Sequence, residues 1–230
     1  MNFFPLLADF VLKRRIIVIV FGFLIALLLM AGAPNINFDT DARVFFDKNN
    51  PDRIALDNFE AAYSKDDNLA FVLSPNDGNV FSAETLKAVG QLTEDAWLLP
   101  YVRTVNSLTN YQNSYAEDDS LVVEDLITDI NNISPSDITK AQEVANSRIE
   151  LKNTFINENN SITQVNVLFR LPGEDAIVEV PFVMGEAEKL KADFEEKNPN
   201  IDIRMVGVVP LHNQYSESGQ DDTATLTPLM

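Results

Sequence analysis

The chain has no cysteine and only one histidine among its 230 residues. Without cysteine it can form neither a disulfide framework nor a thiol nucleophile nor a cysteine-ligated metal site. His212 has Leu211 and Asn213 beside it, so no carboxylate close in sequence supports a metal site or a catalytic dyad. Gly-rich phosphate loops, nucleophile elbows and histidine-based zinc motifs are also missing. We therefore expect no enzyme activity, no metal and no cofactor.

Basic residues are few as well. Seventeen Lys and Arg face 35 Asp and Glu, which gives a formal net charge of −18. Because such a field repels phosphates, we expect no nucleic-acid partner. The spacing of Asp39 and Asp41 matches only the first two positions of an EF-hand loop, and the glycine and terminal glutamate do not follow. A connector with helix-capping aspartates is favoured over a calcium site.

Charge is missing altogether from residues 16–33, and Lys13, Arg14 and Arg15 stand directly before them. At about 1.5 Å per residue this stretch is roughly 27 Å long, which is close to the hydrocarbon thickness of a bilayer. It predicts a transmembrane helix. The basic cluster places the N-terminus in the cytoplasm and the bulk of the chain in the periplasm, at the bacterial inner membrane.

A cleaved signal peptide is the alternative, because Ala31, Gly32 and Ala33 fit the small-residue cleavage pattern. The apolar run is longer than a signal-peptide core, and Pro34 after the cut makes a poor protease substrate. A membrane anchor is therefore favoured. In residues 1–15, apolar side chains at helical spacing indicate an amphipathic leader in the cytoplasmic interface, or an extension of the membrane helix.

The rest of the chain alternates between strand and helix patterns and predicts an α+β fold. Two strand–helix–strand units pack helices on one face of a small sheet, and two such halves favour a ferredoxin-like, split-βαβ arrangement, with one unit for each of two porter subdomains. We expect a connector and helix over residues 34–67, with Ile54, Leu56 and Phe59 as packing residues, and then a first unit made of strand 68–73, a helix that Ser82 caps and that ends at about residue 98, and strand 102–108. A loop over 109–135 follows, in which 121–130 is a strand or short helix, and then a helix that begins at Ser136 or Asp137 and ends at about 151. The second unit is strand 161–171, a helix with Pro181 in its first turn that ends at about 197, and strand 201–208, and a return segment covers 211–230.

The order of several short motifs resembles the N-terminal region of exporters of the resistance–nodulation–division superfamily, in its MMPL-like branch. Each motif is weak alone, but together they cover essentially the whole chain. They are Phe38, Asp39, Thr40 and Asp41 with Phe45 and Phe46; Asn50 and Pro51; residues 68–72 (NLAFV); residues 102–108 (VRTVNSL); residues 207–210 (GVVP); and residues 221–230, similar to the approach to that family's second membrane helix.

The resemblance implies a proton-driven permease whose periplasmic porter domain, here residues 68–210, passes hydrophobic or amphiphilic cargo through a cleft between two tilting units. Its expected partners are membrane lipids, this cargo, the remaining membrane helices and further copies in a homo-oligomer. The family's proton relay lies in membrane helices beyond Met230, so we expect this chain to be the N-terminal fragment of an exporter. A complete single-span protein with a periplasmic ligand- or partner-binding domain is the alternative, and a tethered hydrolase acting through His212 is a third.

Five aromatic residues are candidates for a cargo cleft or interface: Phe45, Phe46, Phe71, Trp97 and Phe169. Such clefts are mostly apolar. Phe71, Trp97 and Phe169 occur at strand or helix spacing, so the hydrophobic core is the favoured location for them. Phe45 and Phe46 follow the apolar stretch outside any clear periodicity, which indicates an interfacial anchor or a cargo entrance.

Overall fold

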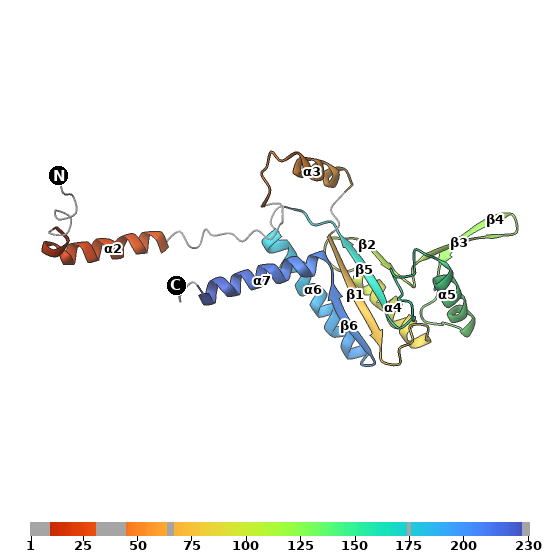
Figure 1. The fold of residues 1–230 in the computed structure, drawn as a ribbon. Coiled ribbons are helices and arrows are strands. Elements are labelled where there is room, and N and C mark those ends of the chain that lie inside the picture. Colours follow the sequence, from red (N-terminus) through yellow and green to blue (C-terminus); the bar gives the residue numbers. More distant parts are fainter. Residues whose placement is uncertain (1–9, 31–44, 64–66, 174–175, 227–230) are drawn as a thin grey trace. The chain divides into compact units, whose positions relative to one another are not determined.

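The computed structural model describes residues 10–30, 45–63, 67–173 and 176–226. The chain divides into two compact units, Met1–Phe38 and Asp39–Met230. The first unit contains helix α2 (Arg15–Met30), and the second contains the other described helices and strands (Figure 1). Each unit is described by itself.

Helix α2 corrects the prediction for residues 16–33. It has 16 residues, or about 24 Å at 1.5 Å per residue, whereas the hydrocarbon core of a bilayer is about 30 Å thick. Among the described residues, no helix is both long enough and apolar enough to cross a membrane. The predicted transmembrane helix is therefore wrong. The predicted leader falls largely on residues 1–9, which lie outside the described residues, as does most of the connector.

The second unit is built on a four-stranded antiparallel sheet. Its strands are β1 (Asp67–Pro75), β2 (Val102–Ser107), β5 (Thr163–Phe169) and β6 (Ile201–Val206), and their order is β2-β5-β1-β6. Helix α4 (Ala83–Ala96) connects β1 to β2, and α6 (Ala176–Lys197) connects β5 to β6. The two strand–helix–strand units are thus present, and they interleave into one split-βαβ sheet.

The interleaving contradicts the prediction of two subdomains. Strand β1 belongs to the first strand–helix–strand unit (β1-α4-β2), yet it pairs with both strands of the second such unit (β5-α6-β6). Phe71 lies opposite Val165 on β5 and Met205 on β6. Because hydrogen-bonded strands of both units alternate, the units form one layer and cannot tilt against each other. The α+β part of the predicted fold class is confirmed, whereas its transmembrane helix and its two separate porter subdomains are wrong.

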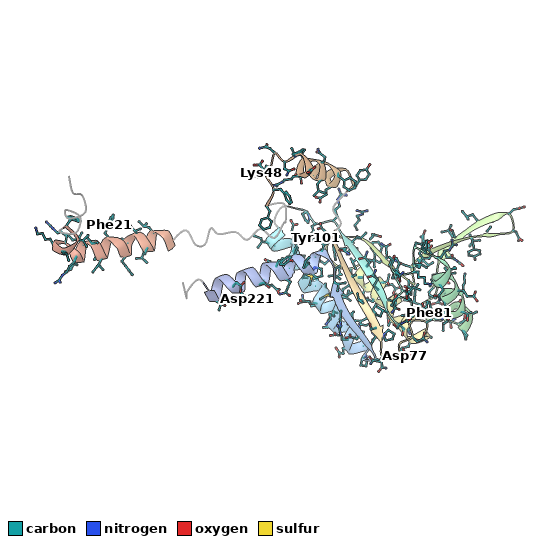
Figure 2. All side chains as sticks on the ribbon, viewed as in Figure 1. Phe21, Lys48, Asp77, Phe81, Tyr101 and Asp221 are labelled. Atoms are coloured by element: carbon teal, nitrogen blue, oxygen red, sulfur yellow. The ribbon has the colours of Figure 1, made fainter. Side chains whose placement is uncertain are left out.

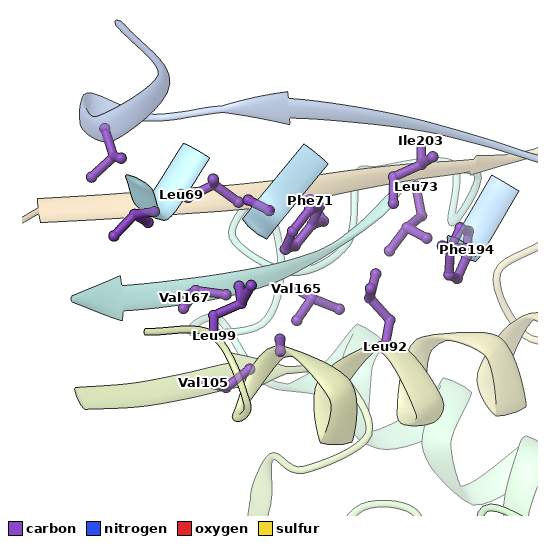
Figure 3. Packing of buried hydrophobic residues seen from close by; sticks show 14 of the residues in the cluster. Leu69, Phe71, Leu73, Leu92, Leu99, Val105, Val165, Val167, Phe194 and Ile203 are labelled. Carbon is purple, nitrogen blue, oxygen red and sulfur yellow. The ribbon is translucent and has the colours of Figure 1, made fainter. Parts of the chain in front are cut away.

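The core lies between the sheet and helices α4 and α6 (Figure 3). Strand β5 shows why: its residues alternate between buried and half-buried, so Val165, Val167 and Phe169 all face the helices, as predicted. Phe71 and Leu73 on β1 and Phe194 on α6 complete the same layer. Burial of these large side chains stabilises the domain by about 1.5–3 kcal/mol each before entropy is subtracted.

The two core helices differ in how well their starts were predicted. Helix α4 begins as expected, because the Ser82 side chain accepts a hydrogen bond from the Thr85 amide, and it buries Val89 and Ala96. Helix α6 begins at Ala176, five residues before Pro181, so the prediction that Pro181 lies in the first turn is wrong. Proline removes one backbone hydrogen bond there, and the buried side chains beyond it hold the helix on the sheet.

The predicted loop over residues 109–135 contains a β-hairpin, and the strand alternative for residues 121–130 is confirmed over the first part of that range. Strands β3 (Gln112–Glu117) and β4 (Ser120–Asp125) form a separate two-stranded sheet that projects beside helix α5 (Pro135–Ser147) (Figure 1). Ser134, rather than Ser136 or Asp137, caps α5, and the Asp137 carboxylate accepts a hydrogen bond from the Ser134 amide. A second cluster of buried residues, including Phe81, Leu108 and Ala141, joins this region to the start of α4.

One helix precedes the first strand of the sheet in the sequence, and another follows the last strand. Helix α3 (Pro51–Tyr63) confirms the helix predicted before the first strand, but Ile54, Leu56 and Phe59 are 44%, 45% and 58% exposed, so their prediction as packing residues is wrong. Helix α7 (Val208–Leu226) follows β6 and packs on α6 and β1.

Candidate functional site

The strands bring several chain segments together at one end of the sheet. Strands β1 and β2 begin there and β5 and β6 end there, as the pairing of Phe169 with both Asp67 and Val102 shows. Tyr101, just before β2, marks this end, and Asp77, just after β1, marks the opposite end (Figure 2). Because α4 leads into β2, α6 follows β5 and α7 follows β6, the C-terminus of α4 and the N-termini of α6 and α7 lie at the same end as Tyr101.

An aromatic pair lies on the surface at this end. The rings of Tyr101 and Phe182 meet edge to face, with 6.2 Å between their centroids. Tyr101 is 41% exposed and Phe182 is 51% exposed, and Val178, one turn earlier on α6, is 63% exposed. We call these three residues the apolar patch. Large apolar side chains that gather on a surface in this way mark interaction sites more often than scattered ones do.

A groove of about 390 Å³ lies between α4 and α6, and we call it the helix groove. Its apolar lining comes from the buried Leu92, Leu99 and Phe194 and from Leu98, which is 83% exposed. Its rim is charged, with Asp95, Glu186, Lys189, Asp193 and Lys197. An apolar floor with a mixed-charge rim suits a molecule with an apolar body and a polar end.

A second groove, of about 590 Å³, lies along the edge strand β2 and the adjoining side of α4, and we call it the polar groove. Residues 125–131 form its opposite wall. Gly90 lets that wall come close to α4: a Cβ at this position would lie 2.5 Å from Cγ2 of Ile130. Trp97 lines the groove and is 48% exposed.

Hydrogen bonds hold the walls of the polar groove. The side chain of Asn110 accepts from the Ser107 amide at 2.7 Å and donates to the Val105 carbonyl at 2.8 Å. The Ile127 amide donates to the Thr109 carbonyl at 3.0 Å, which ties the far wall to the end of β2. These bonds fix the shape of the groove without using most of the polar groups that line it.

The structure separates the aromatic residues that the sequence predicted for a cleft. Phe71 and Phe169 lie in the core, 0% and 1% exposed, and only Trp97 lines a groove. Phe45 and Phe46 are 87% and 54% exposed, and the Phe46 carbonyl accepts a hydrogen bond from Arg53 at 2.8 Å. The structure describes no site that brings the five together.

Sequence reasoning missed Tyr101 and Phe182. Their contact joins residues 81 positions apart, and no local pattern distinguishes either one. His212 lies half-buried on α7. Among the described residues, no group of three or more His, Cys, Asp or Glu side chains could hold a metal ion.

The shifted pKa values lie around the hairpin and α5. A hydrogen bond from Lys140 is the main reason why the pKa of Glu124 is lowered, and the same bond raises the pKa of Lys140. Hydrogen bonds from Ser134 lower the pKa of Asp137. Burial, with Glu150 accepting its hydroxyl at 2.8 Å, raises the pKa of Tyr111. These shifts report structural contacts of the hairpin, α5 and the segment that follows it.

No protein-family model matches the chain, and comparisons with curated proteins and with solved structures found no match either. The resemblance in the sequence therefore stays a prediction, and the two grooves and the apolar patch are the features of the described residues that bear on function.

Proposed function

We propose that this chain is part of a proton-driven export permease of the resistance–nodulation–division superfamily, MMPL-like branch, and that its α+β domain contacts hydrophobic or amphiphilic cargo at the bacterial inner membrane. The helix groove is the observation that carries this proposal. Leu98 exposes an apolar surface over the buried floor of the groove, and the charged side chains around it provide polar contacts for one end of an amphiphile.

The position of the groove supports a role in handling cargo. Leu98 in the helix groove and Tyr101 in the apolar patch are three residues apart, and α6 carries residues of both. An apolar molecule can therefore contact exposed side chains at the Tyr101 end of the sheet and along α6. Leu98 is the strongest single candidate, because exposing 83% of a leucine to water gains nothing for folding.

The surface of α2 supports the proposed location. Large apolar side chains, among them Ile16, Phe21 and Leu28, are each more than half exposed on this helix. The hydrophobic effect disfavours such a surface in water, and the lipid of a membrane is an apolar environment in which it is stable. Membrane lipids, cargo and the membrane helices of the proposed permease are the partners that the proposal requires.

Binding of a fluorescent amphiphile tests the groove directly. N-phenyl-1-naphthylamine brightens in an apolar environment and needs no label on the protein. We expect Leu98→Asp to weaken its binding about tenfold, because a charge in the groove must lose its hydration when the probe enters. Leu121→Asp on the hairpin is the matched control, since Leu121 is also largely exposed, at 74%, and lies outside the groove. Equal binding by both variants and the unchanged chain would reject the groove.

Export from living cells tests the wider proposal. Cells that carry the intact gene should expel a preloaded amphiphile, and a protonophore should stop them. Replacing the gene by its Leu98→Asp form should slow expulsion, whereas Leu121→Asp should not. Expulsion that continues unchanged after deletion of the gene across a panel of amphiphiles contradicts an exporter.

The mass of the native product separates the exporter from the single-domain alternative. This chain has a mass of 25.7 kDa. A permease with further membrane helices requires a product several times larger on an immunoblot of the native cell. A native species of this chain's own mass would instead favour a ligand- or partner-binding protein.

A further inference from the structure

The polar groove has a composition that differs from that of the helix groove and is not explained by amphiphile export. Among the described residues that line it, none is Lys or Arg, whereas Glu94, Asp125 and Asp129 contribute carboxylates. A phosphate, sulfate or carboxylate ligand would meet only negative charge here, in a chain of net charge −18. The groove therefore excludes anionic ligands.

The remaining polar groups both donate and accept hydrogen bonds. Amides from Asn106, Gln112 and Asn131 line the groove, together with the hydroxyls of Thr104 and Thr128. Amide and hydroxyl groups offer donors and acceptors side by side, whereas carboxylates only accept. An organic cation would use the acceptors alone. A neutral polyhydroxyl ligand would use both kinds of group, and its hydroxyls can donate to the carboxylates in charge-assisted bonds.

Trp97 adds an apolar surface in the middle of this polar lining. Its indole is 48% exposed although the residue directly caps α4, and its neighbour Ala96 is fully buried. An aromatic ring is a rigid platform for a flat apolar face. A sugar ring has such a face of C–H groups and a periphery of hydroxyls, so it matches the platform and the surrounding amides together.

We propose that the polar groove is a binding site for a neutral saccharide, with Trp97 as the stacking platform and Glu94, Asp129 and Gln112 as hydrogen-bonding groups. The site is already formed without a ligand. Asn110 is held by the backbone of β2, and the buried Ile127 anchors the far wall. Little ordering entropy is therefore lost on binding. This inference does not depend on the export function.

The sequence offers a direct readout, because Trp97 is the only tryptophan in the chain. The full chain should be kept in solution by an amphipol, which carries neither a sugar nor a quaternary ammonium group. We expect at least one neutral oligosaccharide from a panel built of glucose, galactose, mannose and N-acetylglucosamine to shift Trp97 emission with a dissociation constant in about the millimolar range or tighter.

Adjacent residues of α4 supply matched variants. Glu94 lines the polar groove and Asp95 lines the helix groove. Glu94→Gln and Asp95→Asn each remove one negative charge from the same turn of helix, so they change the overall field equally. We expect Glu94→Gln to weaken saccharide binding about tenfold and Asp95→Asn to leave it unchanged. Trp97→Ala, followed by calorimetry, should abolish measurable binding while the far-ultraviolet circular dichroism stays unchanged.

Three outcomes overturn the proposal. The first is that no oligosaccharide of the panel shifts Trp97 emission at concentrations up to about 10 mM. The second is that tetramethylammonium or spermidine shifts the emission instead, in a manner that Glu94→Gln removes, which would assign the groove to an organic cation. The third is that Glu94→Gln and Asp95→Asn weaken saccharide binding equally, because binding then does not depend on this groove.

The saccharide can be free or can be the headgroup of a lipid. Comparing a binding oligosaccharide with its short-chain alkyl glycoside, below the concentration at which that glycoside forms micelles, distinguishes the two sources. Equal affinity indicates recognition of the sugar alone. Tighter binding of the alkyl glycoside that Leu98→Asp reverses indicates that the helix groove takes the chain of the same molecule. Loss of amphiphile export with saccharide binding intact would leave this site standing without the export function.

Discussion

The backbone carbonyl oxygen of Asn68 lies where a side chain on Gly207 would have to stand. A Cβ at Gly207 would be 2.5 Å from this oxygen, and the glycine has a φ of +131°. The Asn68 side chain accepts a hydrogen bond from the Val208 amide at 3.1 Å and donates one to Asn166 at 3.3 Å. One asparagine thus fixes the corner at which β6 becomes α7.

We expect Gly207→Ala to destabilise the domain by about 3 kcal/mol, because it adds a backbone clash to a φ value that side chains rarely adopt. Gly78→Ala is the control: Gly78 has a φ of +67° but nothing within 4 Å of its Cβ position, so only about 1–2 kcal/mol of strain applies. Urea unfolding of both variants measures the difference. Equal destabilisation would show that the approach of Asn68 does not matter.

Local patterns predicted most single elements of the domain but not their pairing. The strand before Ser82, the Ser82 cap and the strand that forms β5 are short-range signals, and each element was found where it was expected. The order β2-β5-β1-β6 depends on contacts between residues about 100 positions apart, such as Phe71 with Val165. No local propensity encodes which strand lies beside which.

The pairing of the hairpin and the grooves were missed for related reasons. Strand β4 is acidic, so its sequence left strand and short helix open, and its Glu124 has partners on two other elements, Tyr115 of β3 and Lys140 of α5. The polar groove exists because Ile130 approaches Gly90 from 40 residues away. Trp97 falls on the apolar stripe of α4, so the sequence favours a core location, and the end of the helix leaves it half exposed instead.

Phe71 and Trp97 should differ sharply in their effect on stability. Phe71→Ala removes a fully buried ring from the sheet layer, and we expect a loss of about 3–5 kcal/mol. Trp97→Ala should cost about 2 kcal/mol, because roughly half of the side chain already contacts water. Thermal unfolding monitored by far-ultraviolet circular dichroism compares the two. A large loss in Trp97→Ala would place the indole in the core and remove the platform of the proposed saccharide site.

The contact between the hairpin and α5 should depend on pH at both extremes. The pKa of Glu124 is lowered by Lys140, so its contribution is present above the unfolded value of about 4.3 and is lost as the pH falls through the folded pKa. The pKa of Lys140 is raised by Glu124, so its contribution is complete below the unfolded value of about 10.4 and is lost as the pH rises through the folded pKa.

Amide chemical shifts of β3 and β4 measure this pH dependence. We expect Glu124→Gln to abolish the acid-side change, whereas Asp125→Asn, the next residue of the same strand, should leave it in place. Lys140→Met should remove the change at the alkaline end and reduce the one at the acid end, where Tyr115 still donates a hydrogen bond to Glu124. An acid-side transition that survives in Glu124→Gln would assign it to another group.

Gly90 and Ile130 should be energetically coupled. In an isolated helix Gly→Ala stabilises by about 1 kcal/mol, but a methyl group at Gly90 would lie 2.5 Å from Ile130 Cγ2, and overpacking costs about 1–3 kcal/mol. Ile130 is half-buried at the groove wall, so its side chain or residues 125–131 must shift. We expect Gly90→Ala to be destabilising in the unchanged chain and stabilising when Ile130→Ala is also present. A double-mutant cycle by urea unfolding gives the coupling, and additive effects would show that the wall moves without cost.

Because the same shift would alter the polar groove, Gly90→Ala should also change Trp97 emission, and Ile130→Ala should restore it.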